Sequence, residues 1–306
     1  RGSLMEFPFQ YDHASALVFG GALPTRVSFD EAAVVILPVP VDRTTSYVGG
    51  TRNGPHEILQ ASTHMELWDD EMKADVHGVG IFTLPEMELP FGEMAPLVEE
   101  IERVAYEIVS RDKFLVSIGG EHSITPPLVS AAARKFPALS VLQIDAHADM
   151  RDSYMGTVHN HACAMRRALQ FARVTQVGIR SLSTEEAEVL PKLKSTVFYD
   201  VDMRRDPTWI DAVVASLAEN VYVTIDVDGM DPAIMPATGT PEPGGLSWPE
   251  ITSLLRATAE RRRIVAADIV ELSPIPGLVA PNFLCANLLY KLLTYRFVSD
   301  PRAKRL

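Results

Sequence analysis

Three side chains that can bind a metal ion follow one predicted strand. The apolar run from Leu139 to Ile144 is typical of a buried strand, and Asp145, His147 and Asp149 follow it at alternate positions. Alternate residues of an extended chain point the same way, so we expect these side chains to share one face. Two carboxylates and an imidazole suit a divalent metal ion. Taken alone, the pattern is equally typical of residues that cap a helix and bond one another.

A second predicted strand ends in the same way. Segment 220–228 is again apolar and rich in β-forming residues, and it places Asp226 and Asp228 on one face. Four aspartates that converge without a counter-charge would repel one another and take up protons. Two divalent cations would balance their charge, so the sequence predicts a centre with two metal ions.

A histidine occupies the same place after a third strand. His122 follows the predicted strand 114–118, and open parallel sheets carry their chemistry beyond the carboxyl ends of such strands. The candidate metal ligands are therefore His122, Asp145, His147, Asp149, Asp226 and Asp228. This oxygen-rich set suits manganese better than zinc or copper. A water shared by two such ions is acidified toward neutrality, and the resulting hydroxide is a hydrolytic nucleophile.

The rest of the chain alternates between the periods of strands and helices. Strands are predicted at 32–39, 114–118, 139–144, 173–179, 196–199, 220–228 and 264–271. One helix is predicted to begin with Pro55 in its first turn, and another to end at Lys135. Further helices are predicted at 93–110, 161–171, 184–193, 209–218, 247–261 and 282–298. Ser247 and Glu250 form a capping box at the start of the helix at 247–261. This alternation is typical of an α/β fold with a mainly parallel sheet.

Composition favours one large domain. The chain has 306 residues, of which 47% are hydrophobic, and no Pro- or Gly-rich linker divides it, so we predict a single domain over 1–306. Residues 1–4 precede Met5 and are interpreted as an expression-vector remnant. The net charge of -12 argues against nucleic-acid binding and is compatible with a cationic substrate.

Cysteine use and hydropathy predict the compartment. Cys163 and Cys285 form no C-x-x-C motif, so we interpret them as ordinary thiols in a reducing cytoplasm. We recognise no signal peptide and no apolar run near the roughly 20 residues that span a membrane. We therefore expect a soluble, cytoplasmic protein without a membrane partner.

Several motifs together resemble the ureohydrolase family of arginases and agmatinases, and agmatinases most. They are G-G-E-H-S at 119–123, D-A-H-A-D at 145–149, D-V-D-G-M-D-P at 226–232, G-T-P-E-P-G-G-L at 239–246 and D-I-V-E-L-S-P at 268–274. The resemblance implies a three-layer αβα fold with an eight-stranded parallel sheet. It also implies two Mn2+ per subunit at the carboxyl edge of the sheet, and a homo-oligomer that is a trimer or a hexamer.

The resemblance implies a place for each metal ligand. One manganese would be held by His122, Asp145, Asp149 and Asp226, and the other by Asp145, His147, Asp226 and Asp228. Asp145 and Asp226 would then bridge the two ions. Asp149 would also take the proton of the bridging hydroxide and pass it to the departing amine.

Two further residues gain catalytic roles from the resemblance. Glu271 would pair with the planar guanidinium at two points, with a structural salt bridge or helix cap as the alternative. His161 would shuttle protons, because the usual pKa of imidazole lies near working pH. His159 is the alternative shuttle. Glu121 stands where many relatives carry Asp, and we expect this difference to have little consequence.

The implied reaction is hydrolysis of a linear guanidine to urea and an amine, with agmatine giving putrescine as the first choice. Arginases hold the amino-acid end of arginine with an S-G-N-type loop, whereas segment 151–157 here is R-D-S-Y-M-G-T, so arginine should be a poor substrate. Asp152 or a nearby carboxylate would meet the ammonium of agmatine. Arg151 would instead suit the carboxylate of 4-guanidinobutyrate.

Three other functions share some of these sequence features. A metallophosphatase also uses D-x-H with paired metals, but its asparagine–histidine motif is not found. A deacetylase-type hydrolase needs fewer carboxylates and one zinc. A non-catalytic polyamine-binding protein would keep the fold and lose the chemistry, and the retention of all the candidate ligands together with Glu271 argues against it.

Overall fold

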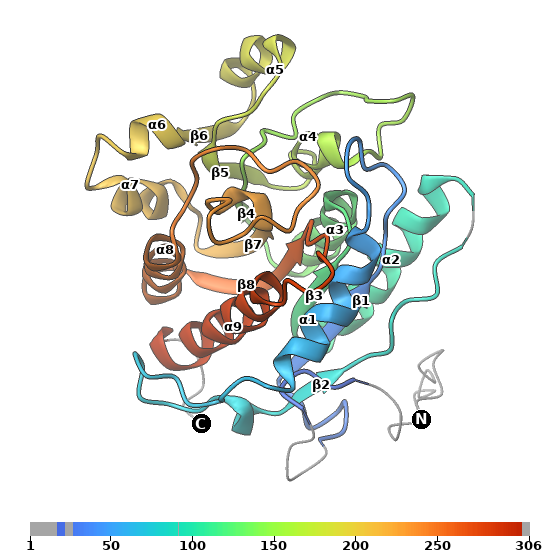
Figure 1. Cartoon of the computed structure of the whole chain (residues 1–306), viewed down its shortest axis with the longest axis vertical. Helices are drawn as coiled ribbons and strands as arrows, with labels where there is room; N and C mark the ends of the chain where they lie inside the picture. Colours follow the sequence, from blue (N-terminus) through green and yellow to red (C-terminus); the bar gives the residue numbers. More distant parts are fainter. Residues whose placement is uncertain (1–16, 22–26, 91, 302–306) are drawn as a thin grey trace.

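The computed structural model describes residues 17–21, 27–90 and 92–301, and its centre is one sheet of eight parallel strands (Figure 1). The strands are β1 Val34–Val39, β2 Ile81–Thr83, β3 Phe114–Gly119, β4 Leu139–Ile144, β5 Arg173–Ile179, β6 Ser195–Tyr199, β7 Asn220–Asp226 and β8 Arg263–Val270. Their order across the sheet is β2-β1-β3-β8-β7-β4-β5-β6. Each predicted strand is present, although the one predicted at 220–228 ends at Asp226. Strand β2 was not predicted, because three residues are too few to show a period.

Helices cover both faces of the sheet and confirm the three-layer αβα architecture (Figure 1). One layer holds α2 Met94–Ser110, α3 Thr125–Lys135 and α4 Ala164–Ala168. The other holds α1 Gly54–Ser62, α7 Trp209–Ser216, α8 Trp248–Arg261 and α9 Ala280–Thr294. The short helices α5 Thr184–Val189 and α6 Asp200–Met203 follow β5 and β6.

Alternate residues of each strand supply the two hydrophobic cores. In β1, Val34 and Ile36 pack in one core and Val35 and Leu37 in the other, and all four are fully buried. Continuous apolar runs are expected for strands that are covered on both faces. Each such side chain stabilises the fold by about 1.5–3 kcal/mol. The cores thus fix the strands, and with them the residues beyond their carboxyl ends.

Three predicted helices differ at their ends. The helix predicted at 184–193 is α-helical only to Val189 and continues as a 3-10 turn. The helix predicted at 161–171 begins with a 3-10 turn, His161–Cys163, because the Asn160 side chain accepts a hydrogen bond from the backbone N–H of Ala162. The last helix begins at Ala280, with Pro281 in its first turn, and ends in a π-helical turn. The capping box of Ser247 and Glu250 is confirmed.

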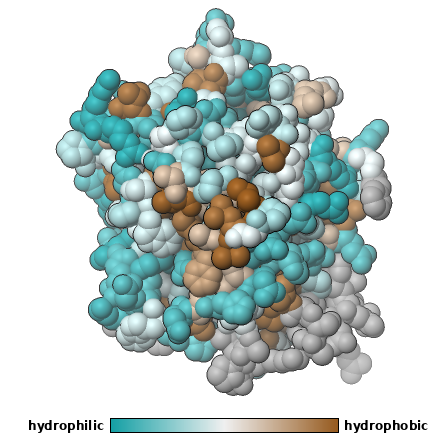
Figure 2. Space-filling view, viewed as in Figure 1, coloured by the Kyte–Doolittle hydropathy of each residue, from teal (hydrophilic) through white to brown (hydrophobic). Residues whose placement is uncertain are grey.

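The surface of the face drawn in Figure 1 is mostly hydrophilic, with a group of apolar side chains near its middle (Figure 2). Ile275, Leu278, Val279 and Phe283, in the segment that leads into and begins α9, are exposed. Within residues 17–21, 27–90 and 92–301, no helix is long and apolar enough to cross a membrane. Residues 1–4, predicted to be a vector remnant, lie outside the described residues.

Candidate metal centre

Four neighbouring strands in the middle of the sheet lead to candidate site residues at one edge. Strands β3, β8, β7 and β4 lie side by side in that order, and their carboxyl ends lead to His122, Glu271, Asp226 and Asp145. Parallel strands bring these ends to a common edge. Residues far apart in the sequence therefore meet.

The predicted metal ligands lie together at this edge. They form two groups, each with ligand atoms within 4.8 Å of one another: His122, Asp145 and Asp226, and Asp145, His147 and Asp228. Asp145 belongs to both groups, as a bridging ligand must. Asp149 lies beside the first group, with its Oδ2 2.9 Å from the Nδ1 atom of His122. The structure therefore brings all the predicted ligands into one cluster.

Most of these ligands lie in turns that follow the strands, and these turns set the directions of their side chains. Strand β4 ends one residue before Asp145, and β7 ends at Asp226, so the predicted strand alternation is wrong beyond those points. The Asp145 carboxylate accepts a hydrogen bond from the backbone N–H of His147 (2.6 Å), and the Asp226 carboxylate accepts one from that of Asp228 (2.9 Å). Asp149 has a left-handed backbone with φ of 52°. The side chains thus converge by tight local turns.

Close contact between two of these turns requires a glycine. A Cβ atom at Gly229 would lie 2.7 Å from the backbone nitrogen of Asp145, which is too close for any side chain. A larger residue at this position would push apart the turns that carry the aspartates. The glycine of the D-V-D-G motif therefore keeps the ends of β4 and β7 together.

His122 is held so that one ring nitrogen faces the carboxylates. The Thr224 hydroxyl donates its hydrogen to Asp268 (2.6 Å), so its oxygen can only accept from the Nε2 atom of His122, 2.9 Å away. Nε2 therefore carries a ring hydrogen, and in the neutral imidazole that binds a metal ion the lone pair lies on Nδ1. Nδ1 is buried without a hydrogen-bond partner, although carboxylate oxygens of Asp149 and Asp145 lie 2.9 and 3.2 Å from it.

The carboxylates of the cluster repel one another. Burial, followed by the charges of Asp228 and Asp145, raises the pKa of Asp226 well above its usual range. Burial and the charge of Asp145 raise the pKa of Asp149 to about 7. An unpaired nitrogen lone pair that faces several crowded carboxylates is the donor set of a divalent cation, so the residues present fit the implied metal.

We expect the affinity of this centre for Mn2+ to rise between about pH 6 and pH 8, because bound protons must leave before a cation can bind. The raised pKa of Asp149, about 7, places one such proton in this range. Burial alone would lower the pKa of His147, but Asp228 and Asp145 outweigh it and raise that pKa, so this imidazole also holds a proton. Calorimetric titration in buffers of different ionisation enthalpy measures both affinity and proton release. An affinity that falls as pH rises would contradict this electrostatic account.

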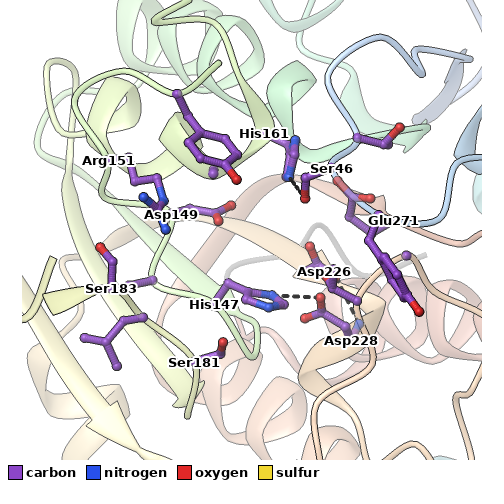
Figure 3. A pocket seen from close by; sticks show the side chains of 18 of the residues that line it. Ser46, His147, Asp149, Arg151, His161, Ser181, Ser183, Asp226, Asp228 and Glu271 are labelled. Atoms are coloured by element: carbon purple, nitrogen blue, oxygen red, sulfur yellow. Dashed lines mark hydrogen bonds and ion pairs between the residues drawn. The ribbon is translucent and has the colours of Figure 1, made fainter. Parts of the chain in front are cut away.

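A cavity of about 250 Å3 opens above the cluster and brings the catalytic candidates to it (Figure 3). Its lining includes Asp149, His161 and Glu271. Glu271 has a left-handed backbone, φ 66°, and its Oε1 accepts a hydrogen bond from the backbone N–H of His122 (2.6 Å). Burial and then the charge of Glu121 raise the pKa of Glu271 well above its usual range. His159 lines a different hollow, so of the two candidate proton shuttles it is His161 that faces this cavity.

The outer part of the cavity contains Arg151 but not Asp152. The Arg151 guanidinium stacks on the Tyr154 ring, 4.6 Å from its centre, and its Nε lies 3.9 Å from a carboxylate oxygen of the buried Glu186. Asp152 is exposed and pairs with Arg167 at 2.7 Å. Asp152 therefore does not line the cavity, whereas Glu186, a nearby carboxylate, does.

Thr224 and Asp268 were not predicted as site residues. Asp268 is fully buried within β8 and also accepts hydrogen bonds from the hydroxyls of Tyr222 (2.7 Å) and Thr125 (3.0 Å). The signal was present, since an acidic residue in the middle of an apolar strand requires a buried partner. Thr224 gave no such signal, because threonine is common in strands.

Comparison with known proteins gives consistent matches. A model described as the arginase family matches residues 32–294. The N(1)-aminopropylagmatine ureohydrolase of Synechocystis sp. is 40% identical over 88% of this chain and 90% of that protein. The agmatinase of Bacillus cereus is 35% identical over 83% of this chain and 88% of that protein. The solved structure of the agmatine ureohydrolase of Thermoplasma volcanium has a TM-score of 0.83 and 33% identity, over 92% of this chain and 94% of that one.

Proposed function

Because this chain belongs to the arginase family, we propose that it is a metal-dependent hydrolase that converts a linear guanidine with a cationic tail to urea and an amine. One observation carries the proposal. A single cavity joins four of the candidate metal ligands, His147, Asp149, Asp226 and Asp228, to Glu271, a buried carboxylate suited to a guanidinium. A metallophosphatase or a deacetylase-type hydrolase would not need a carboxylate that pairs with a planar cation.

We propose that the cluster binds two manganese ions per subunit, held as the family resemblance implies. The carboxylate-rich ligand set with two imidazoles supports manganese over softer metals. When bound, the ions acidify water and so supply a hydroxide near neutral pH. Their positive charge would also keep the buried aspartates ionised.

The chain's own residues orient the substrate and move protons. Glu271 pairs with the guanidinium of the substrate. Burial favours the protonated form of Glu271, and the positive charge of the guanidinium favours the carboxylate form again. Asp149, which lines the cavity, accepts a proton during attack and returns it to the departing amine. His161, on the cavity wall, exchanges protons with solvent.

We propose agmatine or its N-aminopropyl derivative as the substrate. The relatives named N(1)-aminopropylagmatine ureohydrolase and agmatinase support these two compounds. The outer cavity carries Arg151 and Glu186, one charge of each sign, so it does not by itself select a carboxylate tail. Arginine would lose the polar partners of its α-carboxylate, at a cost of about 1–3 kcal/mol or more.

Urea release from agmatine, N-aminopropylagmatine, 4-guanidinobutyrate and arginine at equal concentration tests this assignment. We expect one of the first two compounds to have the highest kcat/KM and arginine the lowest, by roughly tenfold or more, the equivalent of 1.4 kcal/mol. A kcat/KM for arginine at or above that of both agmatine compounds would contradict the substrate assignment. Binding of all four without urea release would favour the non-catalytic alternative.

We also propose a homo-oligomer, a trimer or hexamer, of single-domain subunits in the cytoplasm. The family resemblance supports the oligomer. Exposed apolar side chains such as Val279 and Phe283 are typical of contacts between protein chains. Light scattering coupled to gel filtration measures the subunit count.

A further inference from the structure

His161 is held by hydrogen bonds that begin at Glu121. The Glu121 side chain is fully buried, and its carboxylate accepts four hydrogen bonds. Oε2 accepts from the backbone N–H groups of Arg43 (2.5 Å) and Thr44 (2.6 Å). Oε1 accepts from the hydroxyls of Thr44 (2.7 Å) and Ser123 (2.6 Å). The position of Glu121 thus fixes the position of the Thr44 side chain.

Thr44 in turn determines which nitrogen of His161 carries the hydrogen. Its single hydroxyl hydrogen is donated to Glu121, so its oxygen can only accept further hydrogen bonds. The partners of that oxygen are the backbone N–H of His161 (3.0 Å) and the ring Nδ1 (3.2 Å). Nδ1 must therefore be protonated. The lone pair then lies on Nε2, which is 3.5 Å from the Ser46 hydroxyl oxygen at the cavity (Figure 3).

We propose that Glu121 is a positioning residue that acts through Thr44 to hold His161 with its Nε2 lone pair available for proton transfer. This inference rests on the proposed function, in which His161 moves protons. With the hydrogen fixed on Nδ1, Nε2 is the ring atom left to receive or release a proton in the cavity. The same order of carboxylate, threonine and histidine holds His122 at the metal cluster.

The charge of Glu121 also acts on His161. Burial lowers the pKa of His161, whereas the charge of Glu121 raises it. Loss of the Glu121 charge should therefore lower the pKa of His161 further. The limb of the kcat–pH profile that depends on His161 should then move to lower pH. A residue that served only to support the fold would not move this limb.

Matched variants separate this role from a structural one. Thr44→Val and Glu121→Gln both interrupt the hydrogen-bond chain without a large change of shape, and Thr44→Ser keeps the hydroxyl. Ser123→Ala removes another hydrogen bond to the same carboxylate and leaves the path to His161 intact. We expect kcat to fall about 10- to 100-fold in the first two variants, which is typical when an orienting partner is lost. KM and the manganese content should stay near wild type, Thr44→Ser should recover activity, and Ser123→Ala should retain it.

Nitrogen-15 NMR of histidine-labelled protein gives a readout that does not depend on activity, with His161→Asn to assign the signal. We expect a hydrogen on Nδ1 in the wild type and its loss from that position in Thr44→Val, a substitution of similar shape outside the helices and strands. A hydrogen on Nε2 in the wild type would overturn the inference, as would an unchanged kcat and pH profile in Thr44→Val and Glu121→Gln. If the wild type shows Nδ1–H but releases no urea from any guanidine, the proposed function fails while the hydrogen-bond assignment stands.

Discussion

Asp145→Ala and Asp226→Ala are each expected to abolish urea release. Asp145 is common to both groups of candidate ligands, and the family resemblance gives Asp226 the second bridging place. Loss of a bridging carboxylate leaves both ions short of a ligand, so kcat/KM should fall by far more than the roughly 10- to 100-fold typical of an outer partner. Urea release together with metal content by mass spectrometry measures both effects, and the variants should hold fewer ions per subunit than the wild type.

Asp152→Ala is the matched control for these variants. It makes the same chemical change close to the site, but Asp152 is exposed and pairs with Arg167. Exposed ion pairs contribute only about 0–1 kcal/mol to stability, so the control should keep its metal and its activity. If Asp228→Ala were more damaging than either Asp145→Ala or Asp226→Ala, the bridging assignment would be wrong.

Glu271→Gln is expected to lower kcat/KM by at least one to two orders of magnitude while the metal content stays at the wild-type level. Glutamine keeps the size of the side chain and can still accept the hydrogen bond from the His122 backbone N–H, but it has no charge for the guanidinium. A buried charge that loses its partner costs about 2–5 kcal/mol. Steady-state urea release on both agmatine compounds measures the loss.

Glu57→Gln is the control for the Glu271 variant. The Glu57 carboxylate accepts a hydrogen bond from Asn282 (2.9 Å), and it does not line the cavity. The control should therefore leave the kinetic constants unchanged. A near-wild-type kcat/KM in Glu271→Gln would contradict the contact between Glu271 and the guanidinium. It would favour a structural salt bridge or helix cap at this position.

The strand ends and the identity of the ligands could be predicted from the sequence because they follow from local patterns. Apolar runs mark β3, β4 and β7, and parallel strands bring their carboxyl ends to one edge. This was enough to place His122, Asp145 and Asp226 together. The order of the strands, which places β8 between β3 and β7 and puts β4 beside β7, became visible only in the fold.

The exact backbone of the site could not be predicted, because it depends on contacts between distant residues. Asp149 has a left-handed backbone, and no glycine at this position indicates that conformation in the sequence. Glu121 and Thr44 are 77 positions apart, so their hydrogen bond leaves no trace in local sequence. For this reason the sequence favoured a minor role for Glu121, whereas the fold connects it to His161.

Urea formation by protein with and without manganese tests the central claim most directly. Protein treated with a chelator and then reloaded should hold about two manganese ions per subunit, as a cluster of this donor chemistry predicts. It should release urea and amine in equal amounts from agmatine or N-aminopropylagmatine, whereas the chelated protein should release none and zinc should restore little. Urea release by metal-free protein, or no urea from any guanidine by protein with a full complement of manganese, would contradict the account.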